Sequence, residues 1–508
     1  MKNMMNEMII ERCVAEQMTA EEMLQMGLKY DSGLSVKQDY TEALKWYRKA
    51  AELNNAAAQY FLGRMYEDGH AVDKDLEEAC HWYRKSAEQG DETAQYHLGR
   101  LYETGEGVPQ DYAEALKWYR MAQEKKEPWA AYRIGNMYYY GDGVSQDYAE
   151  ALNHYHKAIN VEIEDAKVTI PDAEIMIGIM YLNGHGVQQD YEEAMRWFRN
   201  AVGPDEGNRF AQYRIGVMYE EGYGMEKNPS EAAKWYRKAA KQDHAGSQYR
   251  LGWLYLEGSG VKQNPKEAMR LFRRAARKEH PGAYNAIAQM YDTGNGVKKD
   301  LDKAFFWYEK AAELGDAPSQ NNLGSMYYHG ESVNQDYHKA VEWYRKAAEQ
   351  GDPTAQCNLG DCLLNGEGIE QDYYAAAEWL RKSAEQGDVI AQYRIAGMYE
   401  TGRGVEKDYA EAAKWYSKAA EQGDGDAQLN LGCLYYNGEG VEQDYTQAKK
   451  LFESAAEQDI PEAQNNLAVI YEEGNGVEQN LEEARRWYQK SADQGFTPAI
   501  QWLKEHTE

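Results

Sequence analysis

The chain has 508 residues, and 43% of them are hydrophobic, which is enough to bury a large core despite a mean hydropathy of -0.85. Its formal net charge is -29 with a pI near 4.9, so its surface repels phosphate groups. Nucleic acid and anionic membranes are therefore not expected as partners. The five cysteines are scattered and none forms a C-x-x-C pair, which excludes a disulfide framework and indicates a reducing, cytoplasmic location.

Residues 1–21 are expected to form an N-terminal capping helix, because residues 3–17 place apolar side chains on one face. Glu7 and Glu11 interrupt this apolar stretch, so it does not have the pattern of a signal peptide. No apolar run in the chain approaches the roughly 20 residues of a membrane span. A docking role for residues 1–21 stays open as an alternative to capping.

A unit of about 36 residues then fills residues 22–498 thirteen times. Its copies begin at residues 22, 58, 94, 130, 173, 211, 247, 283, 319, 355, 391, 427 and 463. This self-similarity predicts an all-α solenoid, in which each helix–loop–helix unit buries its apolar surface against its neighbours. Residues 499–508 repeat only the first helix and predict a C-terminal capping helix that contains Trp502.

The first helix of each unit, here called helix A, has an apolar face; in the third copy it carries Ala94, Leu98, Leu101 and Tyr102. A small residue recurs inside helix A, such as Gly99, and predicts a close crossing by another helix. A G-x-G-V loop follows in most copies. Its first glycine is present in all thirteen and predicts a left-handed helix end.

The second helix, helix B, opens with Asp or Asn in every copy, often with Glu three residues later, as in Asp111 and Glu114. This spacing predicts a capping box, as Thr19 and Glu22 do for the first helix A. The core face expected for helix B in the third copy comprises Ala115, Trp118, Tyr119 and Ala122.

Units such as AEALKWYRKAAEQGDPTAQ resemble Sel-1-like repeats, which are relatives of the tetratricopeptide repeat. The resemblance extends over about residues 20–506. It implies a right-handed superhelix, with helix A on the inner surface and helix B on the outer, and a role as adaptor or scaffold. The branch of the family with a disulfide in each repeat does not fit, because these cysteines do not recur with the unit. The compact, uniform units suggest a bacterial protein.

The sequence contains no recognisable catalytic or metal-binding motif. There is no H-E-x-x-H, no Cys/His pair at ligand spacing, no G-x-S-x-G and no Walker loop. His154 takes the place of the recurring tryptophan of helix B, so core packing explains it better than metal binding. We therefore expect no enzyme activity, no metal and no cofactor.

A stripe on helix A is the candidate binding surface. Positions three, seven and ten of the unit lie together on a face away from the core, and in the copies beginning at 130, 173, 211 and 247 they are mainly apolar or aromatic. Arginines flank them at position four, and Trp, Tyr and Arg are frequent binding hot spots. The predicted partner-binding residues are Tyr132, Arg133, Tyr139, Ile175, Ile179, Leu182, Tyr213, Arg214, Val217, Tyr249, Arg250, Trp253 and Leu256.

Trp253 is expected to anchor a peptide or helix of a partner protein, with the arginines meeting its carboxylates. The alternative is that these side chains are buried against adjacent repeats. Trp129 is expected in a turn between repeats, and residues 160–172 form an insertion that either reshapes the stripe or is a tolerated surface loop.

These observations predict a non-catalytic scaffold or adaptor that binds one or more proteins and can belong to a larger complex. The alternative is a regulatory or inhibitory subunit, similar to an immunity protein, that clamps a single enzyme.

Overall fold

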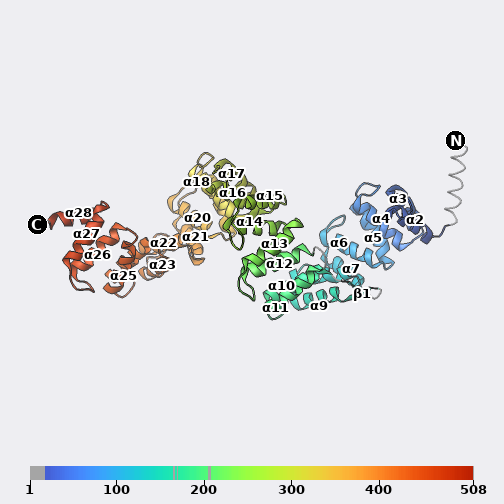
Figure 1. The fold of residues 1–508 in the computed structure, drawn as a ribbon, viewed down its shortest axis with the longest axis horizontal. Helices are drawn as coiled ribbons and strands as arrows, with labels where there is room; N and C mark the ends of the chain where they lie inside the picture. Colours follow the sequence, from blue (N-terminus) through green and yellow to red (C-terminus); the bar gives the residue numbers. More distant parts are fainter. Residues whose placement is uncertain (1–17, 164–165, 169, 204–206, 507–508) are drawn as a thin grey trace. The chain divides into compact units, whose positions relative to one another are not determined.

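The computed structural model describes residues 18–163, 166–168, 170–203 and 207–506. The capping helix expected over residues 3–17 lies outside this range. The chain divides into two compact units, residues 1–262 (unit 1) and 263–508 (unit 2), and each is built from helices packed against their neighbours in sequence (Figure 1).

In both units, even-numbered helices are helix A of the repeat and odd-numbered helices are helix B. The helices of unit 1 are α2 (Ala20–Ser32), α3 (Tyr40–Glu52), α4 (Ala56–Asp68), α5 (Leu76–Glu88), α6 (Glu92–Thr104), α7 (Tyr112–Glu124), α8 (Pro128–Tyr140), α9 (Tyr148–Ile159), α10 (Pro171–Asn183), α11 (Tyr191–Val202), α12 (Arg209–Glu221), α13 (Pro229–Lys241) and α14 (Ala245–Glu257).

Unit 2 continues the same alternation. Its helices are α15 (Pro265–Ala276), α16 (Pro281–Thr293), α17 (Leu301–Glu313), α18 (Ala317–His329), α19 (Tyr337–Glu349), α20 (Pro353–Asn365), α21 (Tyr373–Glu385), α22 (Val389–Thr401), α23 (Tyr409–Glu421), α24 (Gly425–Asn437), α25 (Tyr445–Ala456), α26 (Pro461–Glu473), α27 (Leu481–Asp493) and α28 (Thr497–Glu505). The predicted repetition of helices A and B is confirmed, while the handedness of a superhelix stays a prediction.

The helix ends follow from the residues at the loops. Every helix A from α2 to α26 ends at the first loop glycine in the left-handed conformation; Gly33, for example, has φ 73°. This confirms the predicted helix ends, because a Cβ disfavours that conformation. Ala71 adopts φ 61° at the second loop position, so the fold imposes the same turn where the glycine is missing.

The capping-box prediction is confirmed in one place and incomplete in another. Thr19 and Glu22 form the full reciprocal box at the start of α2. Asp111 accepts a hydrogen bond from the backbone of Glu114, but the Glu114 carboxylate accepts from Lys117 instead of returning to the cap. Asp111 alone therefore caps α7.

The insertion forms the only β-structure among the described residues. Strands β1 (Val161–Ile163) and β2 (Ala166–Val168) pair antiparallel, with Val161 opposite Val168. The hairpin lies between α9 and α10, where other repeats have a short turn. The extra residues therefore close on themselves, and α9 and α10 still contact each other.

In most repeats, the core places a ring of helix B against the small residue of helix A. A Cβ added to Gly99 would lie 2.7 Å from Cδ1 of Tyr119 and 3.2 Å from the backbone carbonyl oxygen of Ala115, which confirms the predicted close crossing by helix B. The tyrosines of helix B, not the tryptophans, are its most deeply buried large side chains: Tyr119 is fully buried, whereas most of the recurring tryptophans are half-buried. Lysines cover several of these tryptophan rings; Lys418 Nζ lies 3.8 Å from the ring centre of Trp415.

Glutamines of helix A bond both to their own repeat and to the preceding one. The side-chain amide of Gln386 donates to Oε1 of Gln356, 30 residues earlier, at 2.9 Å. Gln356 in turn donates to the Ala348 carbonyl at 3.1 Å. Equivalent glutamine pairs recur along both units, so the buried glutamine of helix A bonds to the end of its own helix B and, through its amide, to the preceding repeat.

Candidate functional site

The predicted binding stripe lies entirely in unit 1, on α8, α10, α12 and α14. The structure brings its parts together: α10 and α12 contact each other, and the Tyr139 hydroxyl lies 2.9 Å from Nδ1 of His185 in the loop after α10. Tyr132, Tyr139 and Ile179 pack against one shared hydrophobic cluster. The stripe is therefore a continuous surface over at least α8, α10 and α12.

Most side chains of the stripe are half-buried. Ile175 and Leu256 are buried, with 7% and 6% exposure, and Ile175 belongs to the core cluster formed with α11 and α12. These two residues contribute packing rather than accessible surface, which corrects their predicted role. The other eleven predicted residues keep part of their side chains accessible.

The flanking arginines already have partners in the chain. Arg133 Nη1 lies 3.4 Å from Oε1 of Glu103, and Arg250 Nη1 lies 3.1 Å from Oε2 of Glu220. Both therefore tie one repeat to the preceding one. The Arg214 guanidinium lies 5.9 Å from the centre of the Tyr213 ring, a cation–π arrangement on the stripe itself.

A recurring hydrogen bond underlies the stripe. The hydroxyl of the helix B tyrosine donates to a carboxylate at position ten of helix A in the same repeat. The pairs are Tyr47–Asp31, Tyr83–Glu67, Tyr119–Glu103, Tyr236–Glu220, Tyr308–Asp292, Tyr416–Glu400 and Tyr488–Glu472. Tyr155 and Tyr344 instead contact Asn136 and Ser325, at position seven.

Position ten is not acidic where the core side chain of helix B lacks a hydroxyl. Opposite Phe198 the residue is Leu182, opposite Leu380 it is Leu364, and opposite Phe452 it is Tyr436. Part of the apolar character of the stripe therefore follows from the identity of the buried ring. The sequence carries this signal as a correlation between two positions of the unit, which the periodicity of a single helix does not reveal.

The carboxylates of this network also bind cations from the next repeat. Arg64 Nη2 lies 2.9 Å from Asp31, and Arg100 pairs with Glu67. Burial alone would raise the pKa of Glu67, but contacts from His97 and Tyr83 and the charge of Arg100 lower it to about 2. Glu67 is therefore ionised throughout the neutral range.

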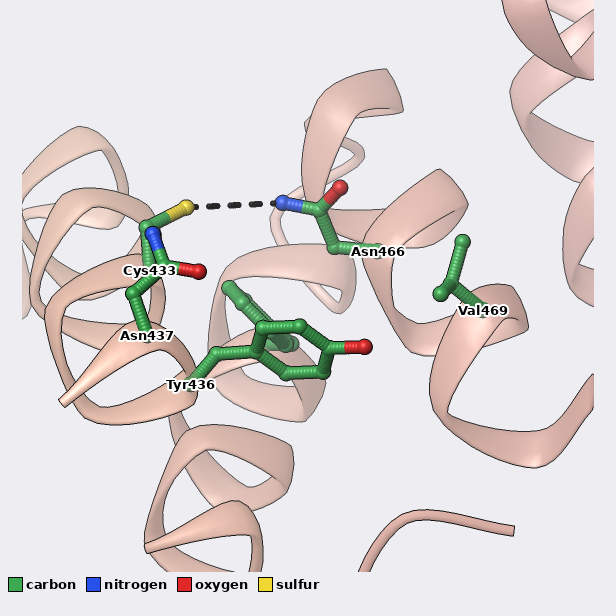
Figure 2. Close-up of a pocket in the computed structure, with 6 residues that line it drawn as sticks. Cys433, Tyr436, Asn437, Asn466 and Val469 are labelled. Carbon is green, nitrogen blue, oxygen red and sulfur yellow. Dashed lines mark hydrogen bonds between the residues drawn. The ribbon is translucent and has the colours of Figure 1, made fainter. Parts of the chain in front are cut away.

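Unit 2 contains a cavity of about 180 Å³ on the equivalent face of α24 and α26 (Figure 2). Figure 2 shows Asn466 donating to the sulfur of Cys433, at 3.6 Å, with the ring of Tyr436 beside them. Phe452, the buried ring of this repeat, also lines the cavity. Burial raises the pKa of Cys433 to about 11, so its thiol stays protonated at neutral pH and is a weak nucleophile.

The other residues singled out in the sequence take structural places. His154 is buried, with Nδ1 2.8 Å from the amide of Gln123, and burial lowers its pKa to about 4, as expected for core packing. Trp129 lies in the first turn of α8 and not between repeats, with its ring edge-on to Tyr132. Cys357 and Cys362 are buried thiols of α20.

Metal-binding clusters are absent from the described ranges, where no group of three or more His, Cys, Asp or Glu side chains is placed to hold a metal ion. In the same part of the chain, no helix is long and apolar enough to cross a membrane.

Comparison with known proteins identifies the repeat. The family model described as Sel1 repeat matches thirteen segments: residues 23–55, 56–91, 93–125, 130–160, 171–202, 209–244, 245–280, 281–316, 317–352, 353–388, 389–424, 425–460 and 461–496. A search of curated proteins found none that matches the chain.

Two solved structures are similar over most of their own length. A protective antigen of uropathogenic Escherichia coli strains with an SLR fold shares 35% identity over 92% of this chain and 97% of its own, with a TM-score of 0.56. A Sel1 repeat protein of Oxalobacter formigenes shares 31% identity over 68% of this chain and 96% of its own, with a TM-score of 0.46.

Proposed function

This chain belongs to the Sel1 repeat family, and we propose that it is a non-catalytic adaptor that holds a partner protein along the helix A stripe of unit 1. One observation carries the proposal. At positions seven and ten, α4 and α6 carry charged pairs, such as Arg64 and Glu67, whereas α10 carries Ile179 and Leu182. Unit 1 thus passes from charged to hydrocarbon surface along one helix face, as expected of a binding site.

The stripe favours a peptide or helix with apolar side chains. Tyr213 and Tyr249 each present part of a ring, and Trp253 lies edge-on to Tyr249 with ring centres 6.4 Å apart. Rings of this kind supply large contact areas at low cost in conformational entropy. Arg214 supplies a positive charge beside Tyr213, so a partner carboxylate next to an apolar residue fits this part of the stripe.

The test uses the full chain and a double variant, Tyr249→Ala with Trp253→Ala, as bait for capture from a native extract. Tyr393→Ala is the matched control, because Tyr393 has the same position in α22 of unit 2 and is also half-buried. Partners retained by the wild type and the control but lost by a folded double variant support the proposal. Equal capture by all three proteins rejects it.

The stoichiometry of the captured complexes separates an adaptor from an inhibitor. An adaptor is expected to give assemblies with two or more different partners, and an inhibitory subunit a tight complex with one enzyme. Native mass spectrometry of the eluted complexes distinguishes the two.

A further inference from the structure

A surface formed by α15 and the neighbouring helices α16 and α17 of unit 2 (Figure 1) carries a positive segment in an acidic chain. Residues 263–278 contain six basic residues and one acidic residue, a net charge of +5 in a chain whose total is -29. Lys266 and Arg273 are exposed on α15, and Arg277 is exposed at its C-terminal cap. Because they are separated by seven and four residues, they share one side of the helix.

Comparison among the repeats shows how unusual this side is. Arg277 follows α15 at a place where nine of the other twelve repeats have Glu or Asp, from Glu52 to Asp493. Phe306 of α17 is 49% exposed, and the other twelve repeats have a polar or charged residue at its place, such as Lys117. Neither residue is therefore required by the repeat fold.

Two open depressions of about 390 and 380 Å³ lie on this surface and share Arg273 and Arg277. The first depression lies along the side of α15. The second reaches Phe306, Trp307 and Lys310, where Trp307 stacks on Tyr284 with ring centres 5.6 Å apart. Guanidinium groups thus border an exposed aromatic surface.

We propose that this basic and aromatic surface binds an acidic segment of a partner protein, with carboxylates on Arg273 and Arg277 and an apolar side chain on Phe306. Charge complementarity carries the choice of partner, since paired guanidiniums bind carboxylates through directed hydrogen bonds. A long polyanion such as nucleic acid would extend beyond these three helices onto acidic repeats, whereas a short acidic peptide fits within them. The surface is separate from the helix A stripe and would give the adaptor a second partner.

The test measures binding of a fluorescein-labelled synthetic peptide rich in Glu, with one Phe, to the full chain by fluorescence anisotropy. The variant is Arg273→Glu with Arg277→Glu. The matched control is Arg237→Glu with Lys241→Glu, which changes the equivalent two positions of α13. Arg237 donates to the Tyr255 hydroxyl at 3.0 Å. Arg273 donates to the equivalent hydroxyl, that of Tyr291, at 3.1 Å. Because Glu occupies the place of Arg277 in eight repeats, that substitution is compatible with folding.

We expect the wild type to bind the peptide more weakly as salt rises, the variant to bind about tenfold more weakly, and the control to bind like the wild type. A second variant, Phe306→Glu, introduces the residue found at this place in α19 and α21 and should also weaken binding. Variants of Tyr249 and Trp253 should leave peptide binding unchanged, which separates this proposal from the one for the stripe.

Three results would overturn the proposal. The first is equal binding of a peptide in which Lys replaces Glu. The second is tighter binding of a short single-stranded oligonucleotide that the variant abolishes, which would identify a nucleic-acid surface. The third is a dimer, seen by light scattering, that the variant dissociates, which would make a second copy of the chain the occupant.

Discussion

The hydroxyl of Tyr83 donates a 2.6 Å hydrogen bond to Oε2 of Glu67, sixteen residues earlier in the same repeat. Glu67 also binds Arg100 of the following repeat, so one buried carboxylate connects the core of one repeat to the surface of the next. The side chain of Glu67 is only 18% exposed. Buried hydrogen-bonded pairs of this kind are costly to break, so the stability of these repeats should depend on pH.

Glu67→Gln should destabilise the repeats around α4 to α7 at neutral pH by about 1–3 kcal/mol. The folded pKa of Glu67, about 2, lies below its ordinary value of 4.5. Its ionic contribution is therefore fully present above pH 4.5 and is lost as the pH falls toward 2. Hydrogen exchange of α4 to α7 at several pH values should show the difference between variant and wild type shrinking over that interval. A difference that stays constant with pH would contradict the assignment.

Phe198→Tyr should destabilise unit 1, because its new hydroxyl would be buried opposite Leu182, which cannot accept a hydrogen bond. A buried unsatisfied hydroxyl costs about 1–3 kcal/mol. Adding Leu182→Glu restores the pair seen between Tyr83 and Glu67 and should recover part of the loss, measured as a double-mutant cycle. Phe452→Tyr is the control: Phe452 lines the cavity shown in Figure 2, so the added hydroxyl has space, and little change is expected.

Gly99→Ala should cost about 1 kcal/mol, because its Cβ would lie 2.7 Å from Cδ1 of Tyr119 and force the helices to shift. Gly397→Ala is the matched test. Gly397 also lies inside a helix A, but its Cβ would be 3.6 Å from the Tyr416 hydroxyl, an ordinary contact. Removing a glycine there should stabilise the chain by about 0.5–1 kcal/mol. Thermal unfolding of the two variants should shift the midpoint in opposite directions.

Trp502→Ala should expose the end of unit 2. The Trp502 indole stacks on Tyr488 with ring centres 4.2 Å apart. Its Nε1 donates to the Glu472 carboxylate at 2.8 Å. In other repeats the equivalent carboxylate binds an arginine of the next repeat. The variant should raise the amide exchange of α26 and α27 but leave α16 to α19 unchanged, because repeats contact mainly their neighbours. Trp502→Phe keeps the ring and should have a smaller effect. Uniform loss of protection across unit 2 would contradict a local capping role.

The sequence predicted the helices well because each copy repeats the same caps, glycines and apolar faces. Gly33, Asp111 and Ala115 have the places expected of them. The core face predicted for helix B of the third copy is confirmed, because Trp118 and Tyr119 are both buried, although in most other repeats the tryptophan is half-buried. Several of these half-buried indoles are covered by a lysine, as Trp379 is by Lys382, a contact that periodicity alone does not reveal.

The candidate site was predicted less completely, because helical periodicity assigns a face but not its depth. Ile175 falls on the same stripe as Ile179, yet it is buried by the next repeat. Arg133 and Arg250 were expected to meet a partner, whereas each already pairs with a glutamate about 30 residues earlier. Such pairings between repeats become visible only when positions of one unit are compared with positions of the next.

The arginine and carboxylate pairs also determine which repeats the gene could lose by in-frame recombination. Deleting residues 94–129 would bring Arg133 after Glu67, an acceptor equivalent to its own, so the junction would keep its charges matched. Deleting residues 211–246 would put Arg250 in the place that Arg214 now has after Leu182, so Arg250 would lose Glu220 and gain no carboxylate in its place. Units that look interchangeable in their helices therefore differ in whether evolution can remove them.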